Sequence, residues 1–337
     1  MSTDVRPKAM IAMSGGVDSS VAALLAMRMG YDCVGVTMKL YEDIKGAEDV
    51  AKTLGIEHRV VDFSDEFRKR VIEPFVCSYE SGETPNPCVI CNKAIKFGLL
   101  YDYAREEGFS KLVTGHYAKV ESGCRLARAK DHSKDQSYFL YCLTPEKLEH
   151  ILFPLGELTK QEVRAIAEEA GLANASKSDS QDICFLPDGK HAEFIAKYRG
   201  TSLSKGNFVD SDGHVIGRHN GIERYTIGQR KGLGVALGRP VFVKEIRPET
   251  GEVVLADEKE VFAKRIEIAD INWLSEKPDR AEVMIRYNTK PVGAKLSHIA
   301  EEKVCAEFDE PVRAPAKGQA AVLYKGDIVL GGGRIAK

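Results

Sequence analysis

The stretch Ser14-Gly15-Gly16-Val17-Asp18-Ser19-Ser20 follows the apolar run Ala9 to Met13 and decides the fold of the first half. A buried strand that breaks at two glycines and then opens a helix forms a cradle for phosphate. Glycine lets the backbone approach closely, and free N–H groups at a helix start attract anions. The serines add hydroxyl donors, and Asp18 stands in the first turn, where a carboxylate is favoured. We expect this helix to end at Gly30.

Two better-known nucleotide loops are excluded by their spacing. The chain contains neither GxxxxGK[ST] nor GxGxxG, so it has no Walker-type loop and no dinucleotide fingerprint. The alternative interpretation is a glycine-rich turn inside an ordinary strand–helix unit. The flanking strand and helix favour the phosphate cradle.

Short apolar strands alternate with helical patterns through the first half of the chain. The expected strands and helices are Ala9–Met13, Cys33–Met38, a helix over Gly46–Leu54, His58–Phe63, a helix over Cys91–Glu107 and Leu112–His116. This alternation predicts an α/β fold with a doubly wound parallel sheet, whose ligands lie at the carboxyl ends of the strands. The phosphate loop, Met38 and Gly115–His116 all follow such ends. Thr159 to Glu162 forms a capping box that opens a helix closing at Gly171.

After about Gly200, glycines and prolines separate short β-type segments such as Tyr225–Gly228, Val241–Val243, Val253–Leu255 and Ala321–Tyr324. This pattern predicts a small β-rich linker domain followed by a compact β-barrel. We expect three domains, over residues 1–200, 201–260 and 261–337. A barrel appended to an enzyme commonly positions a large substrate.

Eight cysteines in 337 residues are too few for a disulfide scaffold. Cys88 and Cys91 form a C-x-x-C pair where a proline-braced loop enters a helix, and Cys184 lies in a separate polar loop. Three such thiols could bind zinc with a fourth ligand, hold an iron–sulfur cluster, or act as a redox relay. Structural zinc or unconnected thiols remain the simpler interpretation. Cys33, Cys142 and Cys305 are expected in the core.

The composition of the chain says little about which molecules it binds. The formal net charge is −2, so a nucleic-acid surface would have to be a local basic patch, with Lys119–Lys134 and Arg224–Lys231 as candidates. The N-terminus lacks an apolar signal core, and no long uncharged apolar run occurs. We therefore expect a cytoplasmic protein that does not contact membranes.

The loop is similar to that of the PP-loop ATP pyrophosphatases, which release pyrophosphate while adenylating an oxygen. The whole chain resembles the tRNA-specific 2-thiouridylases within that group. The resemblance rests on Thr84–Lys93, Thr114–Tyr117, Lys134-Asp135-Gln136-Ser137-Tyr138-Phe139-Leu140, Asp182–Phe185, Gly228–Gly234, Arg286-Tyr287 and Leu330–Gly333. These stretches span nearly the whole chain in order.

The resemblance implies an enzyme that replaces the C2 oxygen of the wobble uridine, in the anticodon stem-loop of tRNA, with sulfur. It implies the cofactors ATP and Mg²⁺ and a sulfur donor or persulfide carrier protein. The implied ATP-binding residues are Ala12, Met13, Ser14, Gly15, Gly16, Val17, Asp18, Ser19, Met38 and Gly115. The implied tRNA-binding residues are Asn86, Pro87, Cys88, His116, Lys134, Asp135, Gln136, Arg286, Tyr287 and Gln319.

One departure from the family pattern bears on the sulfur chemistry. Many members carry aspartate where this chain has Cys88 and are described as using the equivalents of Cys91 as nucleophile and Cys184 as persulfide carrier. The C-x-x-C form resembles instead the branch in which three cysteines, here Cys88, Cys91 and Cys184, hold a 4Fe–4S cluster. Both routes stay open, with the cluster preferred.

Two functions from other classes compete with this prediction. Another ATP-dependent ligase or amidating synthetase with the same loop would need no cysteine trio and no tRNA surface. A nonenzymatic nucleotide-binding module would bind ATP without releasing pyrophosphate when tRNA is added.

Overall fold

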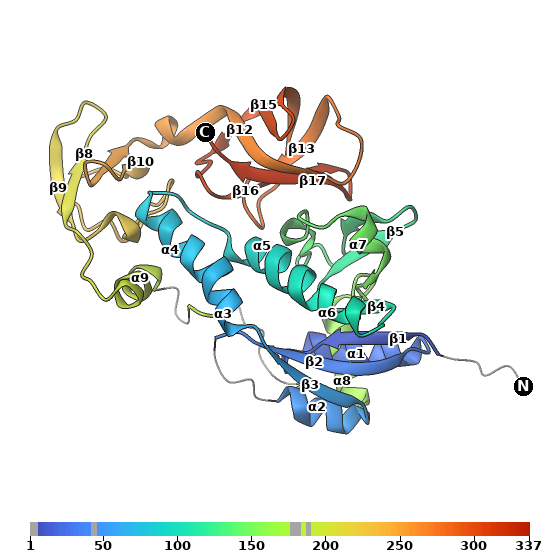
Figure 1. The fold of residues 1–337 in the computed structure, drawn as a ribbon. Coiled ribbons are helices and arrows are strands. Elements are labelled where there is room, and N and C mark those ends of the chain that lie inside the picture. Colours follow the sequence, from blue (N-terminus) through green and yellow to red (C-terminus); the bar gives the residue numbers. More distant parts are fainter. Residues whose placement is uncertain (1–5, 42–45, 176–182, 187–189) are drawn as a thin grey trace, which may run out of the picture.

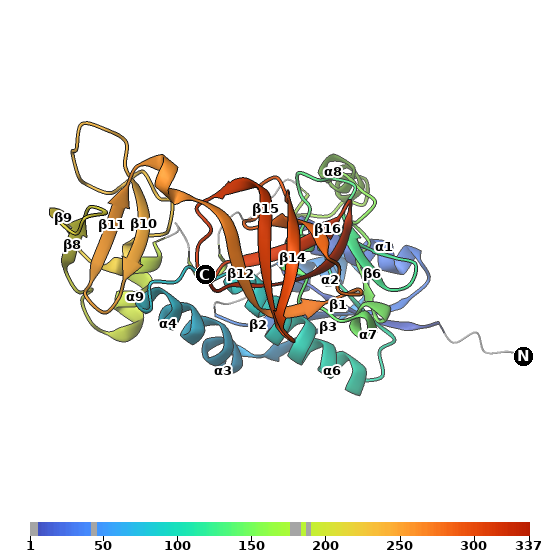
Figure 2. The same ribbon diagram turned by 90° about the horizontal axis from the view of Figure 1, so that it is seen from above.

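The structure is a computed structural model that describes residues 6–41, 46–175, 183–186 and 190–337. Three parts follow one another along the chain: a parallel sheet with its helices, a small antiparallel-rich sheet, and a barrel that lies over the first part (Figure 1). Viewed from above, the small sheet lies to one side of the barrel (Figure 2).

The first sheet has five parallel strands in the order β3-β2-β1-β4-β7. Their bounds are β1 Lys8–Ala12, β2 Asp32–Lys39, β3 Glu57–Asp62, β4 Lys111–Val113 and β7 Ile151–Leu152. The predicted doubly wound parallel sheet is confirmed. As predicted, the phosphate loop, Met38 and Gly115–His116 lie at the carboxyl ends of β1, β2 and β4.

Successive side chains of β1 are buried in two different cores, one on each face of the sheet. Met10 packs against the helices α5 and α6 and against the barrel, whereas Ala9 and Ile11 pack against α1, α2 and α8. These helices are α1 Val17–Arg28, α2 Ala47–Leu54, α5 Pro87–Cys91, α6 Leu100–Glu106 and α8 Lys160–Glu169. A π-helical segment, η2 (Asn92–Leu99), joins α5 to α6, so the predicted helix over Cys91–Glu107 is continuous but not purely α-helical. Thr159 and Glu162 form the expected capping box of α8.

A helical segment that the sequence analysis missed supports the loop of Cys184. It comprises α3 (Ser64–Phe67), η1 (Arg68–Ile72) and α4 (Glu73–Glu80). Together with α9 (His191–Arg199) it buries Phe185, whose ring meets Phe67 and Phe75 edge-on at 5.7 and 5.3 Å. The residue after Cys184 is thus anchored in a core. Shorter helices elsewhere are η3 Ser137–Phe139, α7 Pro145–Glu149, η5 Ile222–Arg224 and η6 Glu258–Val261.

The middle sheet has four strands in the order β10-β11-β8-β9. Their bounds are β8 Gly206–Val209, β9 Val215–His219, β10 Phe242–Arg247 and β11 Glu252–Ala256. The β-type segment expected over Tyr225–Gly228 is wrong, because these residues form a loop after η5. Tyr225 uses its ring to pack edge-on to Phe208, and Gly228 has φ +84°, which lies outside the range of a regular strand.

The last part is a closed barrel of six antiparallel strands. They are β12 Phe262–Trp273, β13 Arg280–Met284, β14 Val292–Ala300, β15 Lys303–Arg313, β16 Ala320–Lys325 and β17 Ile328–Ile335, and the pairing of β17 with β12 closes the circle. The expected C-terminal barrel is confirmed. The hairpin β5–β6 (Ala118–Glu121 and Arg125–Arg128) of the first part extends its sheet, since β6 pairs with β17.

Direct hydrogen bonds fasten the barrel to the first part. The Tyr138 hydroxyl donates to the carbonyl of Ala320 at 2.9 Å, and the Asn272 amide donates to the carbonyls of Tyr141 and Leu143 at 2.6 Å. The run Gly331–Gly333 lies at this seam. A side chain at Gly332 would stand 2.7 Å from the Tyr141 ring. Glycine is required there because the backbone and the ring nearly touch.

A search of the described residues finds no helix with both the length and the apolar character needed to cross a membrane.

We expect Gly332→Ala to destabilise the protein by about 1–3 kcal/mol, because the new methyl group meets the Tyr141 ring and a backbone oxygen. Urea unfolding measures the change. Ser297→Ala, at an exposed position of the same barrel, is the control and should stay within about 0.5 kcal/mol of the parent. Equal stability of the two variants would contradict the tight seam.

Candidate active site

The phosphate loop connects β1 to α1 with the geometry that the sequence predicts. Gly15 has φ +71°, and Gly16 is the N-cap of α1 without a side-chain cap. The Ser14 N–H donates to the Ser19 hydroxyl at 3.2 Å, and that hydroxyl donates to the carbonyl of Gly16 at 3.0 Å. The loop is therefore stabilised by its own hydrogen bonds. The N–H groups at the start of α1 have no side-chain cap, as an anion site requires.

Two polar side chains of this loop are engaged within the protein: Ser20 as a donor and Asp18 as an acceptor. The hydroxyl of buried Ser20 donates to the carbonyl of Gly16 at 2.9 Å, so it supports the loop, contrary to the expectation that it faces phosphate. Asp18 accepts from Lys160 Nζ at 2.7 Å and from the Tyr117 hydroxyl at 2.9 Å. These bonds tie α1 to α8 and to the segment after β4.

Gly115 brings the end of β4 against the start of α1. A Cβ atom at this position would lie 2.7 Å from the carbonyl carbon of Asp18 and from the nitrogen of Ser19. Only glycine permits such contact between two backbones. The next residue, His116, is consequently fixed beside the phosphate loop.

A single cavity of about 660 Å³ joins the phosphate loop to the three cysteines. Among the predicted site residues it is lined by Met13, Ser14, Met38, Pro87, Cys88, Cys91, His116, Gln136 and Cys184. Ala12, Gly15 to Ser19, Gly115 and Asn86 adjoin these lining residues along the chain, and Val17 is buried in the core behind the loop. The structure thus brings the predicted nucleotide and sulfur residues to one cavity.

The three cysteines reach this cavity from two directions. Cys88 and Cys91 stand on α5, whose start is capped by the Asn86 side chain accepting from the Val89 N–H at 3.3 Å. Cys184 comes from the segment anchored by Phe185. All three are free thiols. Desolvation raises the pKa of Cys88 and Cys184 and raises that of Cys91 to about 12, so the thiols are protonated at neutral pH.

Lys96 is the cation of the cavity, and the sequence analysis missed it. Its field lowers the pKa of each of the three thiols, against the larger effect of desolvation. Its Nζ lies 3.4 Å from Nε2 of His116. An ammonium group can only donate, so Nε2 accepts and Nδ1 carries the proton, which it donates to the Thr114 hydroxyl at 2.8 Å. Burial, and then Lys96, hold the pKa of His116 well below 6.5, so the imidazole is neutral.

Helical spacing was the available signal for Lys96. Cys88, Cys91, Asn92 and Lys96 follow one another at intervals that place them on one face of a helix. Asn92 is buried and donates to the carbonyl of Phe139 at 3.1 Å. Aromatic lining by Tyr41, Phe67, Phe139 and Phe185 was also missed.

The remaining predicted tRNA residues lie outside the cavity, apart from Gln136. Asp135 is buried, and its carboxylate accepts from Ala129 and Ser137, which makes it a support of the local fold. It lines a smaller cavity of about 220 Å³ together with Tyr287 at the barrel seam. Arg286 and Tyr287 form a turn after β13. The Gln319 amide donates to the carbonyls of Thr84 and Pro85 at 3.2 and 3.4 Å, in the segment that precedes Cys88.

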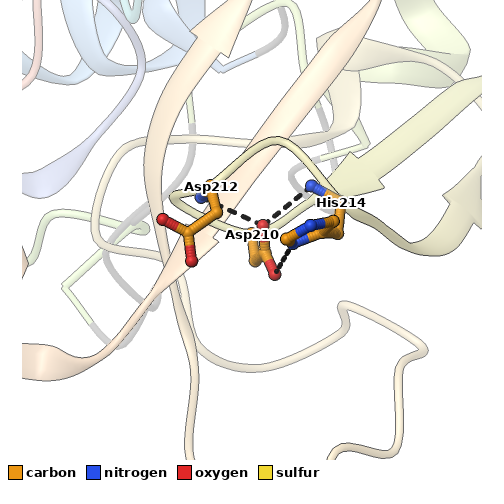
Figure 3. A group of neighbouring side chains, drawn as sticks. All are labelled: Asp210, Asp212 and His214. Atoms are coloured by element: carbon orange, nitrogen blue, oxygen red, sulfur yellow. Dashed lines mark hydrogen bonds and ion pairs between the residues drawn. The ribbon is translucent and has the colours of Figure 1, made fainter.

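Asp210, Asp212 and His214 are the described residues whose carboxylate and imidazole atoms lie close enough to share one metal ion (Figure 3). The Asp210 carboxylate accepts from the N–H groups of Asp212 and His214 at 3.0 and 2.8 Å. These bonds are those of a tight turn between β8 and β9, which accounts for the cluster. The sulfurs of Cys88, Cys91 and Cys184 are not all within 4.8 Å of one another.

The chain matches known protein families and individual proteins over most of its length. Family models match over residues 7–188 (tRNA methyl transferase HUP domain), 192–257 (tRNA methyl transferase PRC-barrel domain) and 263–335 (aminomethyltransferase beta-barrel domain). The chain is 44% identical to the tRNA-specific 2-thiouridylase MnmA of Clostridioides difficile strain 630, over 98% of each chain. It is 45% identical to the protein of that name from Clostridium perfringens strain 13, again over 98% of each.

The chain belongs to the tRNA-specific 2-thiouridylase family. The expected enzyme class, an ATP-dependent tRNA sulfurtransferase, is confirmed. A solved structure described as the predicted subunit of a tRNA methyltransferase from Methanocaldococcus jannaschii aligns with a TM-score of 0.36 at 23% identity, over 58% of this chain and 89% of that one.

We expect Gly115→Ala in this 2-thiouridylase family member to lower ATP-dependent pyrophosphate release by about 100-fold, because the methyl group displaces the start of α1. The exposed turn variant Ser122→Ala should keep the parent rate. A near-normal rate for folded Gly115→Ala would contradict the role given to this contact.

Protonation of His116 should destabilise the fold. The folded pKa lies below the unfolded value of about 6.5, so the unfolded chain binds the proton more tightly and stability falls as pH drops below 6.5. Urea unfolding of parent and His116→Gln between pH 8 and 5 tests this. The stability difference between parent and variant should shrink toward low pH. A difference that stays constant would show that His116 is not held neutral.

Proposed function

We propose that this chain adenylates the C2 oxygen of the wobble uridine of tRNA and replaces that oxygen with sulfur, releasing AMP and pyrophosphate. The observation that carries the proposal is the single cavity lined both by the phosphate loop and by three thiols. An ATP-dependent ligase or a passive nucleotide-binding module has no use for the thiols. The family relationship supports the proposed substrate.

Adenylation solves a chemical difficulty at C2. The carbonyl is amide-like, so its carbon is a poor electrophile and its oxygen a poor leaving group. Attack of that oxygen on the α-phosphorus of ATP forms an O–P bond and breaks the bond to pyrophosphate. The backbone of Ala12 to Ser19 would hold the phosphates, while Met38 and Gly115 frame the adenosine. Magnesium would enter with ATP and balance charge on the departing pyrophosphate.

Lys96 and His116 suit the next step. A sulfur nucleophile bonds to C2, and the C2–O bond then breaks, with AMP taking the oxygen. Negative charge grows on the AMP oxygens, and an ammonium group in a partly dry cavity stabilises such charge strongly. Neutral His116 holds Lys96 by accepting from it and does not compete as a second cation.

Cys88, Cys91 and Cys184 would hold a 4Fe–4S cluster. Thiolates are the usual ligands of iron–sulfur clusters, and all three thiols line the same cavity. They are the cysteines among the described residues that line it, so three ligands would leave one iron of a cluster open. Bound there, the cluster would present sulfide to the reaction.

The persulfide route is the alternative within the same function. The terminal sulfur of a Cys184 persulfide would bond to C2 as AMP leaves. Attack of the Cys91 sulfur on the Cys184 sulfur, with the thiol proton passing to the released base, would then free the thiolated base and form a disulfide, which an external thiol must reduce. In either route a donor or carrier protein supplies the sulfur.

The tRNA would lie across the first part and the barrel. We assign residues 1–200 to the chemistry, 201–260 to a linker and 261–337 to tRNA positioning. Arg286 and Tyr287 lie in the turn after β13, where the Tyr287 ring packs against Phe139. Asp135 and Gln136 line the seam cavity and the main cavity respectively. Gln319, Asn86, Pro87 and His116 would border the uridine, which must leave its stack at a cost of a few kcal/mol.

Iron analysis after anaerobic reconstitution tests the cluster. The parent should bind about four irons per chain, whereas Cys88→Ala, Cys91→Ala and Cys184→Ala should each lose most of the iron and the thiolation of tRNA. All three should still bind ATP, because the phosphate loop is unchanged. Cys124→Ser, outside the cavity, is the control.

An iron-free parent that thiolates tRNA at full rate would overturn the cluster and favour the persulfide. Thiolation at the parent rate in all three cysteine variants would instead show that the thiols have no part in the function.

A further inference from the structure

Helix α8 and the turn that follows it each contact the phosphate loop. At its start, Lys160 Nζ lies 2.7 Å from the Asp18 carboxylate. In the turn beyond its last residue, the side-chain amide of Asn174 reaches the loop from behind. Asn174 belongs to none of the motifs that identify the family in this sequence.

The amide of Asn174 makes two hydrogen bonds with the loop. Its Nδ2 donates to the carbonyl of Gly15 at 3.1 Å and to the Ser20 hydroxyl at 2.9 Å. A carbonyl can only accept, so the NH₂ group and not the oxygen of the amide must face Gly15. The Ser20 hydroxyl in turn donates to the carbonyl of Gly16. Asn174 thus supports two consecutive peptide groups of the loop, one directly and one through Ser20.

These bonds determine where the next N–H group points. In a trans peptide the carbonyl of one residue and the N–H of the following residue point in opposite directions. With the Gly15 carbonyl held toward Asn174, the N–H of Gly16 is turned to the side of the loop remote from α8. Gly15 has φ +71° and no side chain, so little else in the residue itself restricts this peptide.

We propose that Asn174 is a positioning residue for ATP, which fixes the Gly15–Gly16 peptide so that its N–H faces a nucleotide phosphate. The inference rests on the proposed use of ATP and adds a residue to that site. Asn174 itself is firmly placed: the neighbouring Leu172 and Ala175 are buried in the core shared with α1, and Arg164 donates to the carbonyl of Ala175 at 3.0 Å.

Titration calorimetry with MgATP tests the proposal on the full-length protein. Asn174→Ala should weaken ATP binding by about tenfold, the effect of losing one to two hydrogen bonds. Asn174→Asp should weaken it further, because it removes both donors and adds a negative charge behind the phosphates. Asn174→Ser, which keeps one donor, should fall between Ala and the parent. The exposed variant Asn220→Ala is the matched control.

Steady-state kinetics separate positioning from a general loss of structure. The KM for ATP should rise in the Asn174 variants, while the KM for tRNA and the urea midpoint stay near the parent values. Unchanged ATP affinity in Asn174→Ala and Asn174→Asp would overturn the inference, and so would a parallel loss of ATP and tRNA binding. A parent protein that binds no ATP would instead contradict the proposed function.

Discussion

The close contact between Gly115 and the start of α1 is the constraint on which the site depends. A missing Cβ lets the end of β4 touch the backbone of Asp18 and Ser19, so two neighbouring strands deliver their loops to one point. The phosphate loop, stabilised by its own serines and by α8, then lies beside His116. His116 in turn orients Lys96, whose field reaches all three thiols. In the proposed reaction, this one contact would link the nucleotide site to the thiols.

The barrel supports the segment that leads to the cysteines of α5. Gln319 donates to Thr84 and Pro85, and the Thr84 N–H donates to the carbonyl of Lys317 at 2.8 Å. Gly318 approaches the same segment so closely that a Cβ would stand 3.0 Å from the Thr84 carbonyl oxygen. This segment leads directly to Asn86, the cap of α5. If the barrel holds tRNA as proposed, the RNA would be connected by a few bonds to Cys88 and Cys91.

The phosphate loop and the C-x-x-C pair could be predicted from local sequence, because they lie at a strand end and in one short helix. The role of Cys184 and the tRNA-binding residues rested on the family resemblance. The glycine loop, the C-x-x-C pair and the capping box of α8 each act through neighbours in the chain. What was missed depends on distant partners. The hairpin β5–β6 joins a barrel two hundred residues away, Tyr225 leaves the β pattern to pack on Phe208, and Asn174 carries no motif at all. Lys96 could have been predicted, because its spacing from Cys88 and Cys91 places it on the same face of a helix.

The central claim is that the C2 oxygen leaves the base on the nucleotide, and isotope transfer tests it most directly. A tRNA whose wobble uridine carries ¹⁸O at C2 is thiolated by the reconstituted enzyme in unlabelled water, and the AMP is analysed by mass spectrometry. We predict that each AMP carries one ¹⁸O atom and that one labelled AMP forms for each sulfur atom that the tRNA gains. Thiolated tRNA accompanied by unlabelled AMP would contradict the account.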